Sequence, residues 1–150
     1  MLSEAEHPPG SSPLDLLRRE SRSLVQRLRL WTPARYAALV PGTDVSRGDV
    51  VHHLAQCFAD AVGAYDQAGP RAVPRLPVDL VLADQLAVTA DDLVRARPPD
   101  AAVVLATAHL LAHRADLLDD AVPAGLAAAL GLDDVVAAGR AACQLAAGGR

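Results

Sequence analysis

The chain of 150 residues has no lysine, no isoleucine and no asparagine, and it contains few cysteine and aromatic residues. Its two cysteines, Cys57 and Cys143, are too few to build the disulfide framework of a small secreted domain. Aromatic residues make up 3% of the chain, which disfavours domains that bind single-stranded nucleic acid by base stacking. The 14 basic residues are all arginine, and 18 acidic residues outnumber them, so the net charge of −4 leaves no positive excess to neutralise phosphates. We therefore expect no nucleic-acid partner.

Signals for secretion and membrane insertion are also missing from the sequence. The first residues do not show the basic segment followed by an apolar stretch that marks a secretion signal. The longest apolar stretch, residues 101–111, contains His109 and is shorter than the about 20 residues that cross a bilayer. These absences predict a cytoplasmic protein without a membrane partner.

The chain is rich in alanine and leucine and has no alternating strand pattern, which predicts an all-α fold. Apolar periodicity and helix-start signals indicate helices over about residues 13–31, 46–67, 78–95 and 101–118. The similar lengths of these helices and their short connections favour a four-helix bundle with an additional alanine-rich C-terminal helix. We expect residues 1–12 to be a disordered tail and residues 13–147 to form a single domain.

Two of the predicted helices begin with a capping signal. Ser12 stands three residues before Asp15, and Ser46 stands three residues before Asp49, the spacing at which a hydroxyl accepts a hydrogen bond from the first turn. The Thr-Pro pair at residues 32–33 is expected to end or kink the first helix, with a loop following as far as residue 44.

Two histidines lie on the predicted helix 101–118. His109 and His113 are four residues apart, so their imidazoles project from the same face, the spacing with which one helix supplies two ligands to a metal. This helix is apolar nearly all round, which predicts a buried position for it. Buried imidazoles need polar partners, and a metal would satisfy both at once. The alternative is two core histidines that are hydrogen-bonded to backbone or to other side chains.

A third histidine is expected to join this pair from the helix 46–67. Periodicity predicts an inward stripe on that helix made of Val50, His53, Leu54, Cys57, Ala61 and Tyr65. The same periodicity assigns His52 to a more hydrated side. His53, His109 and His113 together would give three nitrogen ligands with an open fourth position, the pattern of a catalytic zinc site.

Cys57 offers an alternative to the open site. It follows His53 by four residues on the same face, and thiolate is a preferred zinc ligand. With Cys57 as an extra ligand the site would have three His and one Cys, four-coordinate and closed, and would be structural. A buried cysteine outside any site is the other interpretation.

Two segments resemble the signatures of a known family. SRGDVVHHLA at residues 46–55 resembles the second-helix signature of the N-terminal domain of mycothiol-dependent maleylpyruvate isomerases, which belong to the DinB-like metal-binding helical bundles. HLLAHRAD at residues 109–116 resembles the second signature of that family, in which a ligand stands four residues before the His of a His-Arg-x-Asp sequence. The resemblance extends over about residues 14–120 and identifies the chain as a shortened, actinobacterial-type member.

The resemblance implies a divalent metal, usually zinc, on His53, His109 and His113. It also implies that this metal binds and deprotonates the thiol of mycothiol or a related small molecule, which then attacks an electrophilic substrate as in a thiol-dependent transferase or isomerase. Asp60 and Asp116 each stand seven residues after one of these histidines and are candidates to accept the second imidazole N–H group. Their alternative is that of solvated acids near helix ends.

Several differences from the family support a second function. In the second signature the first ligand is His109, where the isomerases often have Glu. Val45 stands at the position before the first signature where the family usually has Trp. The interval between His53 and His109 is also shorter than is usual in the family. These differences favour, as the alternative, a non-enzymatic binding or regulatory module with a structural metal site or no metal. The apolar C-terminal helix (Val135, Val136 and Leu145) is a candidate surface for a homodimer.

Overall fold

The computed structural model describes residues 12–65, 69 and 71–118, and the structural statements that follow concern these residues. The elements are α1 (Pro13–Leu28), α2 (Pro33–Ala37), α3 (Arg47–Tyr65), the 3-10 turn η1 (Asp79–Val81), α4 (Leu82–Ala96) and α5 (Asp100–Leu118). The described part of the chain has no strand beyond one isolated β-bridge, so the predicted all-α class is confirmed there. The predicted tail (apart from Ser12), the C-terminal helix and the dimer surface on it lie outside the described residues.

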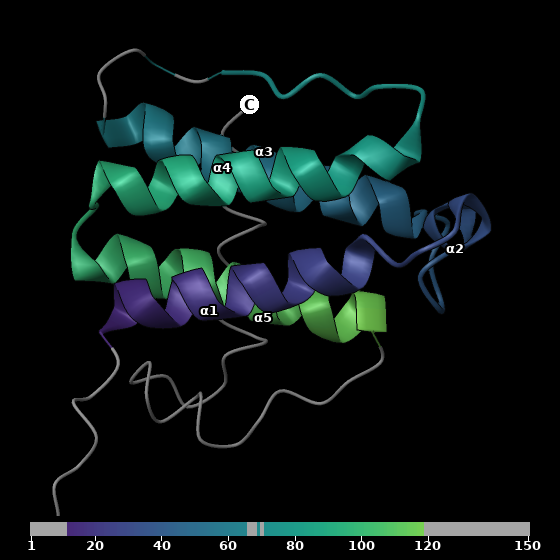
Figure 1. Ribbon diagram of the computed structural model, residues 1–150, viewed down its shortest axis with the longest axis horizontal. Coiled ribbons are helices and arrows are strands. Elements are labelled where there is room, and N and C mark those ends of the chain that lie inside the picture. The colour runs from purple at the N-terminus through teal and green to yellow at the C-terminus, as the bar shows by residue number, and fades with distance from the viewer. Residues whose placement is uncertain (1–11, 66–68, 70, 119–150) are drawn as a thin grey trace, which may run out of the picture.

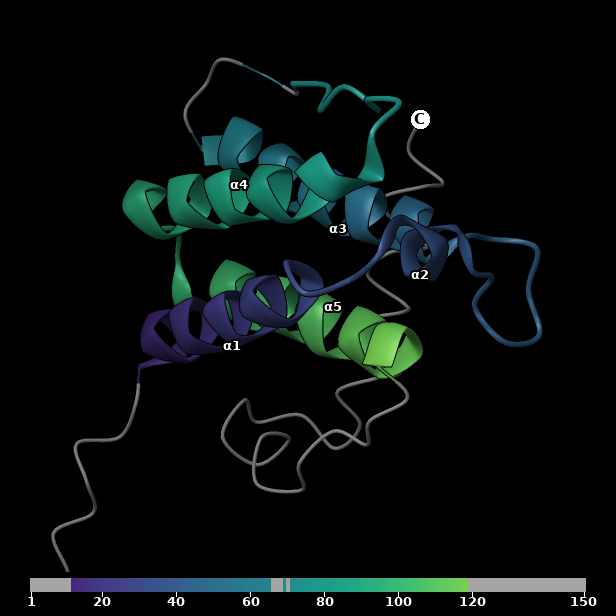
Figure 2. The ribbon, with the colours of Figure 1, turned by 45° about the vertical axis from the view of Figure 1, so that its right-hand side comes forward.

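The four long helices surround one hydrophobic core. α3 lies beside α4 and α1 lies beside α5, and the two pairs are stacked (Figures 1 and 2). Contacts of α1 with α4 and of α3 with α5 join the pairs, so the α1–α4 and α3–α5 interfaces lie on opposite sides of the core. α3 and α5 run in opposite directions (Figure 1).

The capping predictions hold for α1 and α3. The Oγ atoms of Ser12 and Ser46 accept hydrogen bonds from the backbone N–H groups of Asp15 and Asp49 at 3.2 and 3.1 Å. The prediction for Thr32 was incomplete, because α1 ends at Leu28 and Thr32 caps the short helix α2 by accepting from the N–H of Arg35 at 3.3 Å. A threonine cap followed by proline in the first turn starts a helix as readily as it ends one.

Burial of α3 corrects the stripe predicted from periodicity. The apolar side chains of α3 that are fully buried are Val51, Leu54, Ala55 and Phe58. His53 and Cys57 are half-buried, and Tyr65 is 43% exposed. The predicted burial of Leu54 is confirmed. Because α3 packs on both α4 and α5, its most buried line faces between these two helices, whereas His53, Cys57 and Tyr65 lie toward α5.

The helix α5 is the most apolar element of the described chain. By length and composition alone it would be able to cross a membrane, with a mean hydropathy of 1.3. Apolar core helices meet the same criterion, and α5 packs against both α1 and α3. The absence of a membrane partner therefore stays a prediction.

Tyr36 on α2 packs this short helix against the end of α1. Its hydroxyl donates a hydrogen bond to the carbonyl oxygen of Leu28 at 2.8 Å, and its ring meets that of Trp31 edge-on with centroids 5.1 Å apart. The side chain is fully buried. Burial, together with the negative charges of Asp79 and Asp84, raises the pKa of Tyr36 from 10.0 to about 12.

This pKa predicts a loss of stability at high pH. Below pH 10 the phenol is protonated in both the folded and the unfolded chain, so Tyr36 adds no pH dependence there. Between about pH 10 and 12 the unfolded chain releases a proton that the folded chain keeps, so the free energy of unfolding falls as the pH rises. Urea unfolding followed by Trp31 fluorescence measures this fall. The Tyr36→Phe variant should lose most of it, and an equal slope in both proteins would contradict the assignment.

A largely buried ion pair joins α1 to α5. The Nη1 atom of Arg114 lies 3.1 Å from Oε2 of Glu20, and the side chains are only 18% and 11% exposed. The Nε atom of Arg114 is buried and makes no further hydrogen bond in the described structure. The charge of Arg114 therefore depends on Glu20 for compensation.

Removing the charge of Glu20 should destabilise the fold strongly. We expect Glu20→Gln to lower the free energy of unfolding by about 3 kcal/mol, because it leaves a guanidinium buried without its counter-charge. The control is Asp84→Asn, which breaks the exposed pair of Asp84 with Arg29 at 3.0 Å and should change stability by less than about 1 kcal/mol. If urea unfolding gives equal losses of stability for the two variants, the Glu20–Arg114 pair contributes no more to stability than an exposed ion pair.

Candidate metal centre

The three histidines selected from the sequence come together at the α3–α5 interface. The ring centroids of His53 on α3 and His113 on α5 are 5.4 Å apart, with the ring planes at 90°. The rings of His109 and His113 are nearly parallel, at 25°, with centroids 6.4 Å apart. His109 is 9% exposed, while His53 and His113 are half-buried.

The antiparallel course of α3 and α5 explains this gathering. Because the two helices are antiparallel, a higher residue number on α3 corresponds to a lower one on α5 at the same height. His53 is therefore opposite His113, and Cys57, one turn later on α3, is near His109, one turn earlier on α5. In agreement, Cys57 and His109 line the same cavity. The spacing of four residues on each helix therefore places the three rings and the thiol in one region.

The donor set suits zinc, and the ring positions match it in part. Two imidazoles on one tetrahedral zinc have centroids about 5.2 Å apart, given Zn–N distances of about 2.0–2.1 Å. The distance between His53 and His113 is close to this value, whereas that between His109 and His113 is longer by about 1 Å. Within the described residues no group of three or more His, Cys, Asp or Glu side chains is already arranged to hold a metal.

Cys57 lies against His53. Its Sγ atom is 3.6 Å from Nε2 of His53, within the range of a thiol–imidazole hydrogen bond. The S–N distance across a tetrahedral zinc is also about 3.6 Å, given Zn–S and Zn–N distances of about 2.3 and 2.0–2.1 Å. The thiol is therefore placed where it can act as a hydrogen-bonding partner of His53 or share a metal with it.

His52 has a different role from its neighbour. Its Nε2 atom lies 2.8 Å from the carbonyl oxygen of Val73, and the side chain is half-buried instead of the more hydrated position expected for it. Gln56, one turn further along α3, accepts from the N–H of Val73 at 2.8 Å and donates to the carbonyl of Arg71 at 2.9 Å. The two side chains hold the crossing segment, residues 71–77, against α3. Periodicity separated His52 from His53 correctly, but it contained no sign of this distant segment.

The two acids proposed as imidazole acceptors are both half-buried. Asp60 accepts a hydrogen bond from Nε2 of Gln56 at 2.8 Å and so supports the side chain that holds the crossing segment. Asp116 lies three residues after His113, near the end of α5. The roles of Asp60 and Asp116 toward His53 and His109 stay predictions.

A cavity that sequence reasoning missed adjoins the histidines. The α3–α5 cavity has a volume of about 180 Å³. It is lined from α3 by Cys57, Phe58, Ala61, Ala64 and Tyr65, and from α5 by Ala102, Leu105, Ala106 and His109. Four of these residues are alanines that leave the space open between the helices. The alanines were visible in the sequence, but they signal a cavity only once the two helices are known to face each other.

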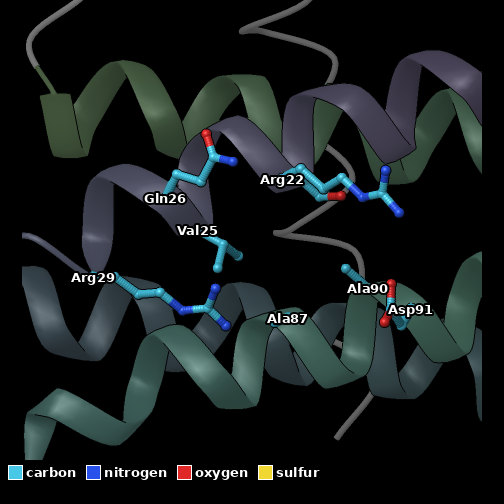
Figure 3. A pocket seen from close by; sticks show the side chains of 8 residues that line it. Arg22, Val25, Gln26, Arg29, Ala87, Ala90 and Asp91 are labelled. Atoms are coloured by element: carbon cyan, nitrogen blue, oxygen red, sulfur yellow. The ribbon is translucent and has the colours of Figure 1, made fainter.

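Two of the other pockets lie on other faces of the bundle, away from the histidines. The pocket between α1 and α4, about 300 Å³, is lined by residues that include Arg22, Arg29 and Asp91 (Figure 3). It lies on the opposite side of the core from the α3–α5 interface, and Arg29 in it pairs with Asp84. A groove of about 420 Å³ lies between the crossing segment and α4. Neither is lined by a described histidine or cysteine.

Comparison with known proteins adds no relative. No family model, no curated protein and no solved structure matches the chain.

Proposed function

We propose that the chain is a DinB-like four-helix bundle that binds one divalent metal ion, zinc in the first place, through His53, His109 and His113. The observation that carries the proposal is the convergence of these three imidazoles from two antiparallel helices, with His53 and His113 at a separation that suits a shared tetrahedral ion. His109 would be the third ligand, and its ring centroid would have to move about 1 Å closer to that of His113.

The proposed activity is thiol-dependent transfer or isomerisation on a small electrophile. A metal held by these three imidazoles would have a position left for a thiol and would lower the pKa of that thiol, so that mycothiol or a related thiol would be a nucleophile at neutral pH. The chain contributes a buried imidazole, that of His109, and the buried apolar ring of Phe58, which both line the α3–α5 cavity. Nickel and iron are alternatives to zinc, because imidazole binds all three.

The position of Cys57 supports a second candidate function. If its thiolate is the fourth ligand, the site is closed and the metal stabilises the fold of a non-enzymatic binding or regulatory module. The distance of 3.6 Å between Sγ and Nε2 of His53 supports this candidate, because it matches the separation across one tetrahedral zinc ion as well as that of a hydrogen bond.

The metal site is tested by a matched pair of neighbouring histidines. We expect the purified wild-type protein to contain close to one zinc per chain, measured by elemental mass spectrometry, and His53→Ala to lose it. His52→Ala should keep the metal, because His52 contacts Val73 and belongs to the crossing-segment contact. Retention of metal in both variants, or absence of metal from the wild type after reconstitution with zinc, would overturn the site.

The role of Cys57 is tested by Cys57→Ser. An open catalytic site predicts that the variant keeps both its metal and its thermal stability, within a few degrees. A closed structural site predicts that both fall together, because metal binding is then part of the folding free energy. Cobalt substitution gives a direct second readout, since a thiolate ligand adds a sulfur-to-metal charge-transfer band that Cys57→Ser would remove.

A further inference from the structure

The α3–α5 cavity has an open end and a chemically distinct closed end. Leu105 and Tyr65, which line it, are 48% and 43% exposed and mark the end that opens to solvent. Phe58 and His109 are 1% and 9% exposed and mark the buried side, and the half-buried Cys57 also lines the cavity. A molecule that enters between Leu105 and Tyr65 would therefore reach an imidazole and a thiol at the far end.

The size of the cavity limits what can enter. Apolar cavities of about 150 Å³ in protein cores hold a benzene molecule. At about 180 Å³, the α3–α5 cavity has room for one six-membered ring with a short substituent.

The lining determines the polarity of the occupant. Apart from His109, Cys57 and Tyr65, every lining residue is alanine, leucine or phenylalanine, and no charged side chain contributes to the wall. Away from those three side chains, a carboxylate or a sugar hydroxyl would lose its hydrogen bonds to water without replacement, which costs about 1–3 kcal/mol for each group. The cavity therefore favours an uncharged apolar group.

We propose that the α3–α5 cavity binds the apolar part of the substrate, a neutral monocyclic aromatic group whose reactive end lies against His109 and Cys57. The polar thiol cofactor is too large and too hydrophilic for this space, so the ring belongs to the second substrate or to a small aromatic thiol. The assignment of the reactive end rests on the proposed metal-dependent function, whereas the binding of the ring rests on the cavity alone.

The binding of the ring is tested with phenylmethanol on the metal-free full-length chain, using calorimetry and backbone amide NMR. Saturable binding at millimolar concentration should perturb amides of α3 and α5 around Cys57 and His109. Ala61→Leu should weaken binding at least tenfold, because its side chain fills the cavity. Ala59→Leu is the matched control: Ala59 is equally half-buried on the same helix but lines the groove beside the crossing segment, so affinity should change less than twofold.

A second filling variant guards against misfolding of the first. Ala102→Leu fills the same cavity from α5 and should give the same tenfold loss. No saturable binding to the wild type, equal affinity of Ala61→Leu and Ala59→Leu, or perturbations confined to α1 and α4 would overturn the proposal.

A thiol analogue separates this proposal from the metal-dependent function. Phenylmethanethiol has nearly the same shape as phenylmethanol, and in the wild type reconstituted with zinc its affinity should exceed that of phenylmethanol at least tenfold, an advantage that His53→Ala abolishes. If both probes bind the cavity and zinc gives the thiol no advantage, the ring site stands and the thiol-activating function fails. If zinc binds but neither probe enters, the ring site fails and the metal site stands.

Discussion

The antiparallel packing of α5 against α3 is the constraint on which the candidate site depends. Each helix carries its chemical groups one turn apart, and a turn of four residues advances about 6 Å along the axis. Because the helices run in opposite directions, the two groups on α3 lie at the same heights along the axis as the two groups on α5. His53 is therefore beside His113, and Cys57 is near His109. The same packing leaves a cavity where alanines of both helices face each other.

The rest of the fold holds these two helices in place from outside. The largely buried ion pair of Glu20 and Arg114 joins α5 to α1, and Arg114 directly follows His113 in the chain. α3 is tied to α4 by the crossing segment, which His52 and Gln56 hold on one side and Gln85 holds on the other through the carbonyl of Pro74 at 2.9 Å. Strong polar contacts therefore lie behind both helices, whereas the interface between them is lined mainly by small and apolar groups. This division would allow the proposed site to admit a ligand without loosening the core.

Local signals in the sequence predicted the elements well. Serine caps at Ser12 and Ser46 located two helix starts, because a cap involves only residues within one turn of each other. Thr32 was harder to interpret, since the same Thr-Pro pair can end one helix and begin another, and only the packing of Tyr36 on the end of α1 decides between them. The inward stripe predicted for α3 differs from the observed buried side for a similar reason. Periodicity gives the mean apolar direction of a helix, whereas its burial depends on the two helices that cover it.

The sequence by itself determined the all-α class, the starts of α1 and α3 and the histidines that share a face, since each of these follows from spacing along a single helix. It also separated His53 from His52, because adjacent residues on a helix point about 100° apart. Only the tertiary structure decided that His53 meets His113, that His52 holds a segment 21 residues away and that a cavity adjoins His109. These facts depend on which helices are neighbours and in which direction they run. Long-range packing sets both, and no local pattern encodes it.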